Sequence, residues 1–181
     1  MSEAARLVTA EELEKFPDDD CRYELVEGRV ICMSPVGFQH GRIVMHFGSL
    51  LHQHVHSRKL GVVLTEVGFK LASNPDTVRA PDIAFIQQDR IPVSEPRGFW
   101  NGPADLAVEV LSPDDRYSDM RTKVEQYLAR GVALVVVIDP DAETAATFRR
   151  SAPSATLHGV ELLDLDDVVP GFSCRVEEIF L

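Results

Sequence analysis

The most apolar stretch of the chain, VALVVVID at residues 132–139, most constrains how it can fold. Such a run is typical of a strand that is buried on both faces, so we expect it at the centre of a sheet. A second apolar run at residues 104–111 precedes it and is followed by SPDD, a helix-start signal in which Pro113 suits the first turn. Gly131 provides a stop for that helix. The middle of the chain is therefore expected to be strand, helix and strand.

Spacing and turn residues place further elements on both sides of this unit. A chain of 181 residues suits one globular domain, so residues 1–181 are expected to form a single domain. The order of elements predicts an α/β fold, with a mixed sheet flanked by helices. The expected elements are a helix capped by Thr9, a hairpin over residues 22–33 that turns at Glu27-Gly28, a helix over 38–58, strands at 61–72 and 80–86, and closing strands at 143–150 and 155–163.

The net charge of −11 bears on any reading that involves nucleic acid. Non-specific affinity for DNA comes mostly from Lys and Arg side chains on phosphates, and an acidic domain repels a polyanion at long range. We therefore expect the chain alone to bind DNA weakly, so that a metal, local positive charge, a second subunit or a partner must offset the repulsion.

Cysteine content and hydropathy indicate the compartment. Three cysteines, Cys21, Cys32 and Cys174, are scattered without metal-type spacing, and a sparse, odd number fits reduced thiols in the cytoplasm. No secretory signal is recognisable at the start of the chain, and no apolar run approaches the roughly 18 residues that span a bilayer. We expect a cytoplasmic protein without membrane contact.

Glu109 lies in the middle of an apolar strand, where a carboxylate needs an explanation. An unpaired buried charge is very costly, so Glu109 is expected to be protonated, paired or bound to a metal; a salt bridge at the rim of the sheet is the alternative. Asp82 begins another apolar strand directly after Pro81, a residue that fits the first position of a strand. Two neighbouring strands would then present both carboxylates on one side. Hard oxygen ligands favour Mg²⁺ or Mn²⁺ between them.

Lys123 is a candidate third member of this site. It flanks the packing face of the helix that follows the Glu109 strand, one turn before Tyr127. Its flexible stem can reach back toward the carboxylates, where an ammonium group would orient water and stabilise charge on a phosphate oxygen. The alternative is an ordinary solvated lysine. His52 and His56 are one turn apart, as two metal ligands on a helix would be, but no acidic or Cys partner is near in sequence, so a polar helix end is expected instead.

An ordered set of segments resembles a known family. These segments are RYELVEGRVICMSP, a helical His40, VRAPDIAFI, PADLAVEVLSPDDR, KVEQYLARGV and VVVIDP, with the tail VPGFSCRVEEIF. Together they resemble the bacterial Uma-type domain of putative restriction endonucleases, in the PD-(D/E)XK nuclease superfamily. The resemblance implies a restriction-endonuclease-like mixed sheet with flanking helices and additional antiparallel strands. It also implies Mg²⁺ at Asp82 and Glu109, and often a homodimer.

The chain departs from the superfamily pattern at one position. The superfamily has a lysine two residues after the acidic residue, where this chain has Leu111, and the Uma-type family is expected to supply the lysine from the next helix, as Lys123. Glu24 also matches the family and is either a further ligand of metal or water, or part of a hairpin salt bridge. His40 is expected either to contact phosphate or to help cap the start of its helix.

The leading functional hypothesis is a Mg²⁺-dependent endonuclease that hydrolyses DNA phosphodiester bonds. Its expected catalytic residues are Asp82, Glu109, Lys123 and Glu24, and His40 is its expected substrate-binding residue. Two alternatives stay open at this point. One is a binding or assembly module that keeps the nuclease fold without the activity, and the other is a metal-dependent hydrolase of a small phosphorylated molecule.

Overall fold

A six-stranded mixed sheet forms the centre of the computed structural model, which describes residues 6–17, 19, 21–113 and 115–181. Only β8 and β9 pair in parallel, and the other neighbours are antiparallel. A parallel pair needs a long crossover, which is where the second long helix lies. The strand order is β11 (Ala152–His158), β10 (Thr144–Arg149), β9 (Leu134–Asp139), β8 (Leu106–Val110), β6 (Ile83–Gln87) and β3 (Gly61–Leu64).

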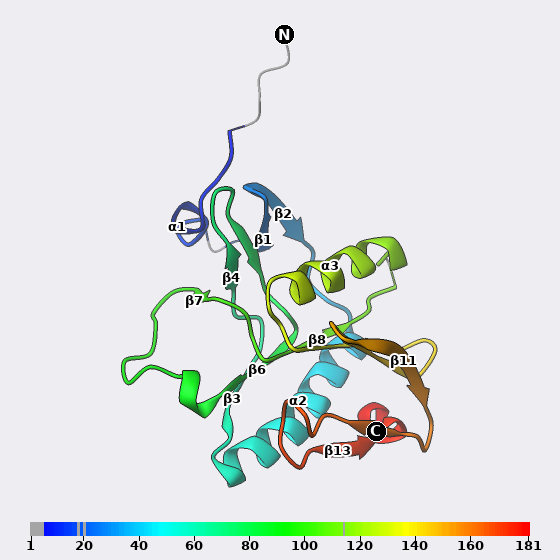
Figure 1. Cartoon of the computed structure of the whole chain (residues 1–181). Coiled ribbons are helices and arrows are strands. Elements are labelled where there is room, and N and C mark those ends of the chain that lie inside the picture. The colour runs from blue at the N-terminus through cyan, green and yellow to red at the C-terminus, as the bar shows by residue number, and fades with distance from the viewer. Residues whose placement is uncertain (1–5, 18, 20, 114) are drawn as a thin grey trace.

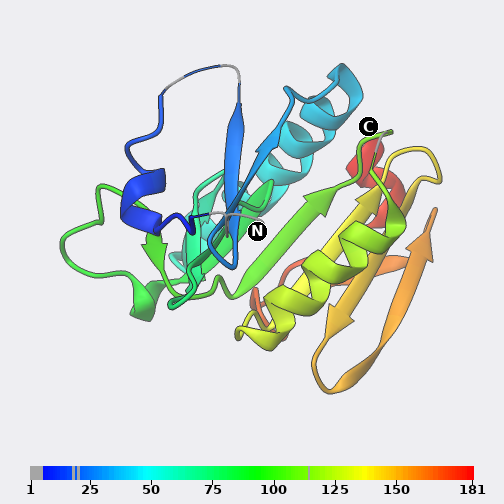
Figure 2. The ribbon, with the colours of Figure 1, turned by 90° about the horizontal axis from the view of Figure 1, so that it is seen from above.

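Two helices lie on opposite faces of this sheet (Figure 1). The helix α2 (Phe38–Arg58) buries one apolar stripe against one face, where Phe47 and Leu51 meet Ile83 and Leu106. The helix α3 (Tyr117–Ala129) covers the other face and lies over the strands in the view of Figure 2. Both faces of the central strands are therefore covered, which explains why β9 is apolar at every position from Leu134 to Ile138.

A second sheet packs beside the first one. The short helix α1 (Ala10–Leu13) closes it by burying Ala10 and Leu13 against Leu25 and Val78. Thr9 caps α1, as its sequence predicts, and Glu12 completes a capping box with it. The strand order in this sheet is β2 (Arg29–Met33), β1 (Arg22–Val26), β5 (Thr77–Arg79), β4 (Phe69–Ala72) and β7 (Trp100–Asn101).

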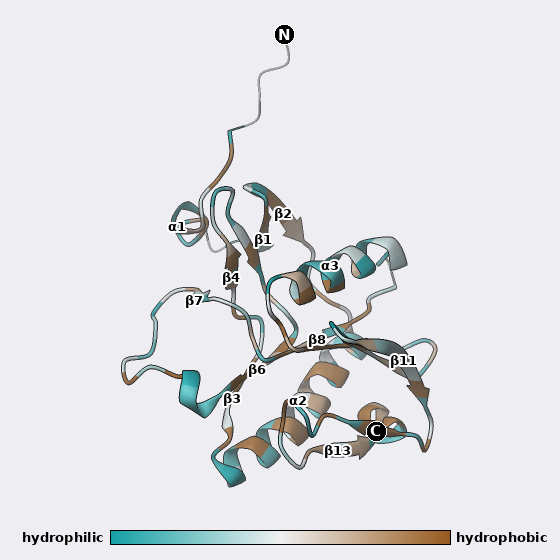
Figure 3. Ribbon diagram, viewed as in Figure 1, coloured by the Kyte–Doolittle hydropathy of each residue, from teal (hydrophilic) through white to brown (hydrophobic). Residues whose placement is uncertain are grey.

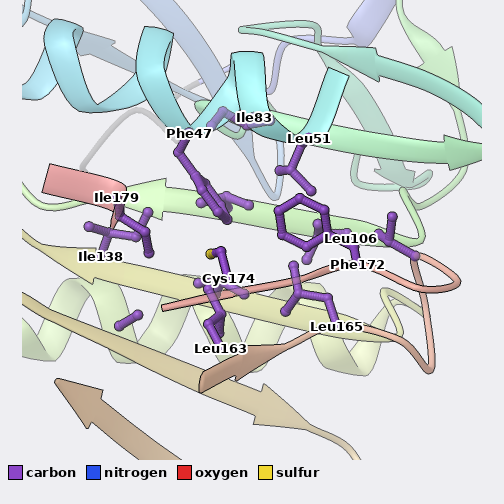
Figure 4. Packing of buried hydrophobic residues seen from close by; sticks show 14 of the residues in the cluster. Phe47, Leu51, Ile83, Leu106, Ile138, Leu163, Leu165, Phe172, Cys174 and Ile179 are labelled. Atoms are coloured by element: carbon purple, nitrogen blue, oxygen red, sulfur yellow. The ribbon is translucent and has the colours of Figure 1, made fainter. Parts of the chain in front are cut away.

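The end of the chain returns to the α2 face of the central sheet. Its elements are β12 (Leu162–Asp164), β13 (Ser173–Arg175) and the 3₁₀ helix η2 (Val176–Phe180), and another 3₁₀ helix, η1 (Gln88–Arg90), follows β6. Figure 4 shows Phe172 and Cys174 of the tail close to Phe47 and Leu51 of α2. Figure 3 shows the brown colour of apolar residues on the central strands and along α2. The tail thus completes the largest of the three hydrophobic clusters.

The α/β fold with a mixed sheet and flanking helices is confirmed, with three local differences. The closing strand predicted over residues 155–163 is divided, because β11 ends at His158 and β12 pairs with β13 in a separate sheet. The sequence predicts one strand over residues 61–72, but β3 pairs with β6 in the central sheet while β4 pairs with β5 in the other. The chain changes sheets at Glu66, whose φ of 57° lies outside the extended region. A hydrophobic pattern alone does not reveal such a change, because both halves are apolar.

The helix after SPDD begins later than predicted. Pro113 was expected in its first turn, but α3 starts at Tyr117. Before it, the Asp115 carboxylate accepts from the Ser112 amide at 2.8 Å, and the Asp115 amide donates to the Ser112 carbonyl at 2.9 Å. This side-chain turn competes with helix at the predicted start. Asp114, which belongs to the same signal, lies outside the described residues.

The expectation of three reduced cysteines is wrong for two of them. Cys21 and Cys32 form a disulfide across the β1–β2 hairpin, with their Cα atoms 5.5 Å apart. The two residues are eleven positions apart in sequence, and only the hairpin pairing brings them together. Cys174 is the free cysteine and is buried. The cytoplasmic location stays a prediction, and it loses the support of reduced thiols.

No helix among the described residues is long and apolar enough to span a bilayer.

The cysteine arrangement predicts the outcome of a thiol titration. The native protein is expected to show no reactive thiol at neutral pH, because burial raises the pKa of the Cys174 thiol to about 12 and keeps it protonated. Denaturation without reductant is expected to release one reactive thiol per chain, and denaturation with reductant three. Titration with a chromogenic disulfide reagent measures these numbers. Three reactive thiols without reductant would contradict the disulfide.

Candidate active site

The pairing of β6 with β8 brings the two predicted carboxylates together. Ile83 pairs with Val108, so continuing the antiparallel register by one residue sets Asp82 beside Glu109. Both side chains are buried. Asp82 Oδ2 accepts a hydrogen bond from the Val110 amide at 2.8 Å, which fixes the aspartate against the end of β8. The strand-initial Asp82 thus reaches across to the neighbouring strand instead of pointing into solvent.

Glu109 has a partner on each carboxylate oxygen, and both partners come from α3. The Tyr127 hydroxyl donates to Oε1 at 2.7 Å, and the Lys123 ammonium donates to Oε2 at 2.9 Å. Lys123 and Tyr127 are four residues apart and therefore lie on one face of the helix. Strand alternation turns Glu109 toward that face, together with Ala107 and Leu111, which pack in the α3-side core.

Glu24 joins the same cluster from the second sheet. Its Oε1 lies 3.1 Å from the Lys123 ammonium and accepts from the Ala80 amide at 2.9 Å. Its Oε2 accepts from Arg79 Nη1 at 2.6 Å, and Arg79 in turn donates through Nε to Gln126 of α3 at 3.0 Å. Lys123 therefore bridges a carboxylate of the small sheet and a carboxylate of the central sheet. Glu24 therefore forms its salt bridges with Arg79 of β5 and Lys123 of α3, in place of the predicted salt bridge within the hairpin.

His40 lies against Asp82 at the start of α2. Its Nε2 is 3.2 Å from Asp82 Oδ1, and its Nδ1 is 3.2 Å from the Ser112 hydroxyl. Arg22 approaches the same Oδ1 at 3.5 Å and contacts Glu66 at 3.1 Å. His40 is buried, so its ring is an integral part of the cluster rather than an exposed surface group. The structure gives it no role in capping α2, whose cap position Gly37 has no side-chain hydrogen bond.

The titration of the cluster reflects a balance between burial and charge. Burial, together with the negative charges of Asp82 and Glu24, raises the pKa of Glu109 to about 7, although Lys123 opposes the rise. Burial also acts to raise the pKa values of Glu24 and Asp82, but neighbouring charges and hydrogen bonds outweigh this effect. Lys123 and Arg79 lower the pKa of Glu24, and contacts with His40 and the Val110 amide lower the pKa of Asp82. The negative charge is thus most poorly compensated at Glu109.

The donor set fits a hard divalent cation. Mg²⁺ is commonly held by one or two carboxylates, with water and substrate phosphate completing the octahedron, and each carboxylate offers more lone pairs than one hydrogen bond per oxygen uses. Asp82 and Glu109 supply such oxygens, and a cation beside them would relieve the repulsion that raises the Glu109 pKa. No group of three or more His, Cys, Asp or Glu side chains with metal-site geometry occurs in the described part of the chain. A two-carboxylate site is therefore the form that these residues suit.

All five predicted site residues are brought together, while their chemical roles stay predictions. Sequence reasoning missed further members of the network, which are Tyr127, Arg79, Gln126, Arg22 and Ser112. Tyr127 lies four residues after Lys123, and this spacing was the sequence signal that both side chains share one face of the helix. Nothing in the sequence near Arg79 or Gln126 points to a shared contact, because they come from different elements.

His52 and His56 do not join this site. Their rings stack at 5.5 Å between centroids with an interplanar angle of 19°. Both side chains are exposed on α2, in agreement with the polar helix end expected from the sequence.

Removal of one hydroxyl group tests the Tyr127–Glu109 contact. Tyr127→Phe is expected to lower the free energy of unfolding by about 1–3 kcal/mol, since it leaves a buried carboxylate oxygen without its donor. Tyr117→Phe is the matched control, because its hydroxyl donates to Asp139 at an exposed site, and a change within about 0.5 kcal/mol is expected. Urea unfolding measures both. Equal effects of the two changes would contradict a special role for the buried contact.

Comparison with known proteins agrees with this fold. Residues 10–177 match the family Uma2, described as a putative restriction endonuclease. A crystal structure of a putative nuclease belonging to DUF820 from Anabaena variabilis ATCC 29413 superposes with a TM-score of 0.84. It has 22% sequence identity, and the match covers 96% of this chain and 97% of that one. A search among curated proteins finds no match. Because the family match spans nearly the whole chain, the protein belongs to the Uma2 family of putative restriction endonucleases.

Proposed function

We propose that the protein is a metal-dependent endonuclease that hydrolyses DNA phosphodiester bonds. The observation that carries the proposal is the convergence of Asp82, Glu109 and Lys123, which come from three separate elements, at one buried cluster. Such an arrangement is costly for stability alone, because buried charges lose their hydration. Family membership and the nuclease-like neighbour support the same reaction class, and the superfamily pattern supports Mg²⁺ or Mn²⁺ as the cofactor.

Each residue has a role in this proposal. A bound Mg²⁺ would supply an acidified water and charge neutralisation at the phosphate. Asp82 and Glu109 would hold that cation, and the Val110 amide and His40 keep the Asp82 carboxylate oriented. Lys123 lies beside Glu109 and places a positive charge where negative charge develops on a phosphate oxygen.

Glu24 is the anchor of Lys123 in this scheme. It contacts the ammonium at 3.1 Å, and its own charge is held by Arg79 at 2.6 Å. The ammonium is thereby positioned by two carboxylates, so it would keep its contact with Glu24 if a cation took the Glu109 oxygens. Burial disfavours the charge of Lys123, but Glu109 and Glu24 outweigh it and raise the Lys123 pKa, so the side chain carries its charge at neutral pH.

The net charge of −11 supports weak binding of DNA by the chain alone. A homodimer, which the family resemblance suggests, would place two sites along one nucleic acid and is part of the proposal. The cytoplasmic location and the hydrolysis of a small phosphorylated molecule stay predictions without a specific contact in favour of them.

A second candidate function has one observation in its favour. Both oxygens of Glu109 are already engaged, by Tyr127 and Lys123, and the position two residues later is Leu111 instead of lysine. A cluster that is satisfied by its own side chains is what a binding or assembly module with the nuclease fold would keep. Titration calorimetry with Mg²⁺ separates the two candidates, because the module is expected to bind the ion no better than a non-specific carboxylate surface.

Conservative changes at the carboxylates test the proposed reaction. Asp82→Asn and Glu109→Gln are each expected to slow Mg²⁺-dependent nicking of plasmid DNA by at least about 100-fold, the scale on which loss of one electrostatic contact at an active site acts. Asp105→Asn is the matched control, because this carboxylate precedes the same strand but pairs with Arg90 at 2.8 Å, away from the cluster. The control is expected to nick at nearly the normal rate. Nicking that survives both cluster substitutions would refute this site.

A further inference from the structure

Arg22 is the basic residue of the cluster that solvent reaches most. Its side chain is 25% exposed, whereas the side chains of Lys123, Arg79 and His40 are 13%, 9% and 8% exposed. Asp82, which Arg22 contacts, is only 6% exposed. Arg22 is therefore the basic group beside Asp82 that a substrate can contact from solvent without entering the buried part of the cluster.

The hydrogen-bonding capacity of Arg22 is used less than that of its basic neighbours. Lys123 lies within 3.1 Å of two carboxylates, and Arg79 donates to one carboxylate at 2.6 Å. The contact of Arg22 with Asp82 is longer, at 3.5 Å, which exceeds a normal N–H···O distance. A guanidinium group carries five N–H donors, more than its contacts with Asp82 and Glu66 require. Arg22 can therefore bind a further acceptor.

Glu66, the other partner of Arg22, is replaceable. Its carboxylate lies 3.1 Å from Arg22 and is 50% exposed. Its amide donates to the Pro81 carbonyl at 3.2 Å, which places the turn after β3 next to the residue that precedes Asp82. An ion pair at such an exposed position contributes little to stability, because water screens it and both side chains lose freedom. A second anion can thus take the place of Glu66 at small cost.

The backbone of Arg22 is held in place by the hairpin. Cys21, the preceding residue, forms the disulfide with Cys32, and Arg22 itself pairs with Met33 in the β1–β2 ladder. Strand alternation turns Arg22 to the same face of β1 as Glu24, which belongs to the cluster. The guanidinium group is therefore presented to the cluster from a fixed strand, as the positioning of a substrate group requires.

We propose that Arg22 binds a phosphate group of the DNA substrate beside Asp82, in place of its contact with Glu66. The planar guanidinium fork can donate two parallel hydrogen bonds to phosphate oxygens. It also places a positive charge beside the acidic pair, where a chain with a net charge of −11 otherwise repels a polyanion. The inference rests on the proposed function, since it names the residue of that site that contacts the substrate phosphate.

Equilibrium binding of a fluorescein-labelled DNA duplex by the full chain, measured by anisotropy with Ca²⁺ in place of Mg²⁺, tests the proposal. Arg22→Gln is expected to raise the Kd about 10- to 100-fold, the effect of losing a charge-assisted contact. Arg22→Lys keeps the charge but not the fork, so a smaller rise of about threefold is expected.

Arg29→Gln is the matched control, because it removes the same charge from an exposed residue of the same hairpin. Arg29 pairs with Val26, about 13 Å along the strand from Arg22, so its substitution is expected to change the Kd less than about twofold. Equal Kd values for Arg22→Gln and the unchanged protein, or equal effects of Arg22→Gln and Arg29→Gln, would overturn the proposal.

The salt dependence of binding separates a phosphate contact from a purely structural role of Arg22. A lost phosphate contact is expected to reduce the slope of log Kd against log salt concentration by about 0.9 in Arg22→Gln. A substitution that only loosens the hairpin leaves the number of phosphate contacts, and therefore this slope, unchanged. An unchanged slope would overturn the contact.

Release of Arg22 from Glu66 is expected to act in the opposite direction. Glu66→Gln should lower the Kd about threefold, because it frees the guanidinium group for the phosphate. Glu177→Gln removes the same charge from a 47% exposed partner of Arg175 and is expected to change the Kd less than about 1.5-fold. Equal effects of these two changes would refute the exchange of partners at Arg22.

Separate scoring of cleavage distinguishes the two proposals. If plasmid nicking depends on Asp82 and Glu109 while binding and its salt dependence are indifferent to Arg22, the phosphate contact is refuted and the proposed function stands. If binding depends on Arg22 but no nicking occurs with Mg²⁺, the proposed function is refuted and the phosphate contact stands.

Discussion

The ammonium group of Lys123 links the parts of this structure that matter for function. It lies 2.9 Å from Glu109 of the central sheet and 3.1 Å from Glu24 of the second sheet, while its own backbone belongs to α3. Three separate elements, β1, β8 and α3, therefore meet at one cation. Without it, the buried Glu109 carboxylate would lose its ion pair and Glu24 would keep only Arg79 as a charged partner, which is strongly destabilising. The contacts of the Lys123 ammonium therefore join the two sheets and α3, and they also shape the site.

This arrangement places function and stability in competition. Burial raises the pKa of Glu109 to about 7, so its ionised form is maintained only with help from Lys123 and the Tyr127 hydroxyl. A divalent cation would compete with these donors for the same oxygens. Glu24, itself held by Arg79, gives the lysine a second contact that does not depend on those oxygens.

Much of the fold and the composition of the site follow from local sequence patterns. The N-cap at Thr9, the turn at Glu27-Gly28 and the apolar strand before Asp139 each depend on residues close in sequence, and each forms where the pattern predicts. The Cys21–Cys32 disulfide and the switch between sheets at residues 65–68 depend on pairing between distant segments, which no local pattern contains. Local spacing therefore predicted that the Lys123 side chain can reach the carboxylates. It did not predict that Glu24, held by Arg79, anchors the Lys123 ammonium.

The position of a bound metal ion is the most direct measurement of the central claim. Anomalous diffraction from crystals of the full chain soaked with Mn²⁺ is expected to show one peak at about 2.0–2.6 Å from a carboxylate oxygen of both Asp82 and Glu109. The Lys123 ammonium should then retain its contact with Glu24. A peak at other residues, or none beside this pair at saturating Mn²⁺, would contradict the account.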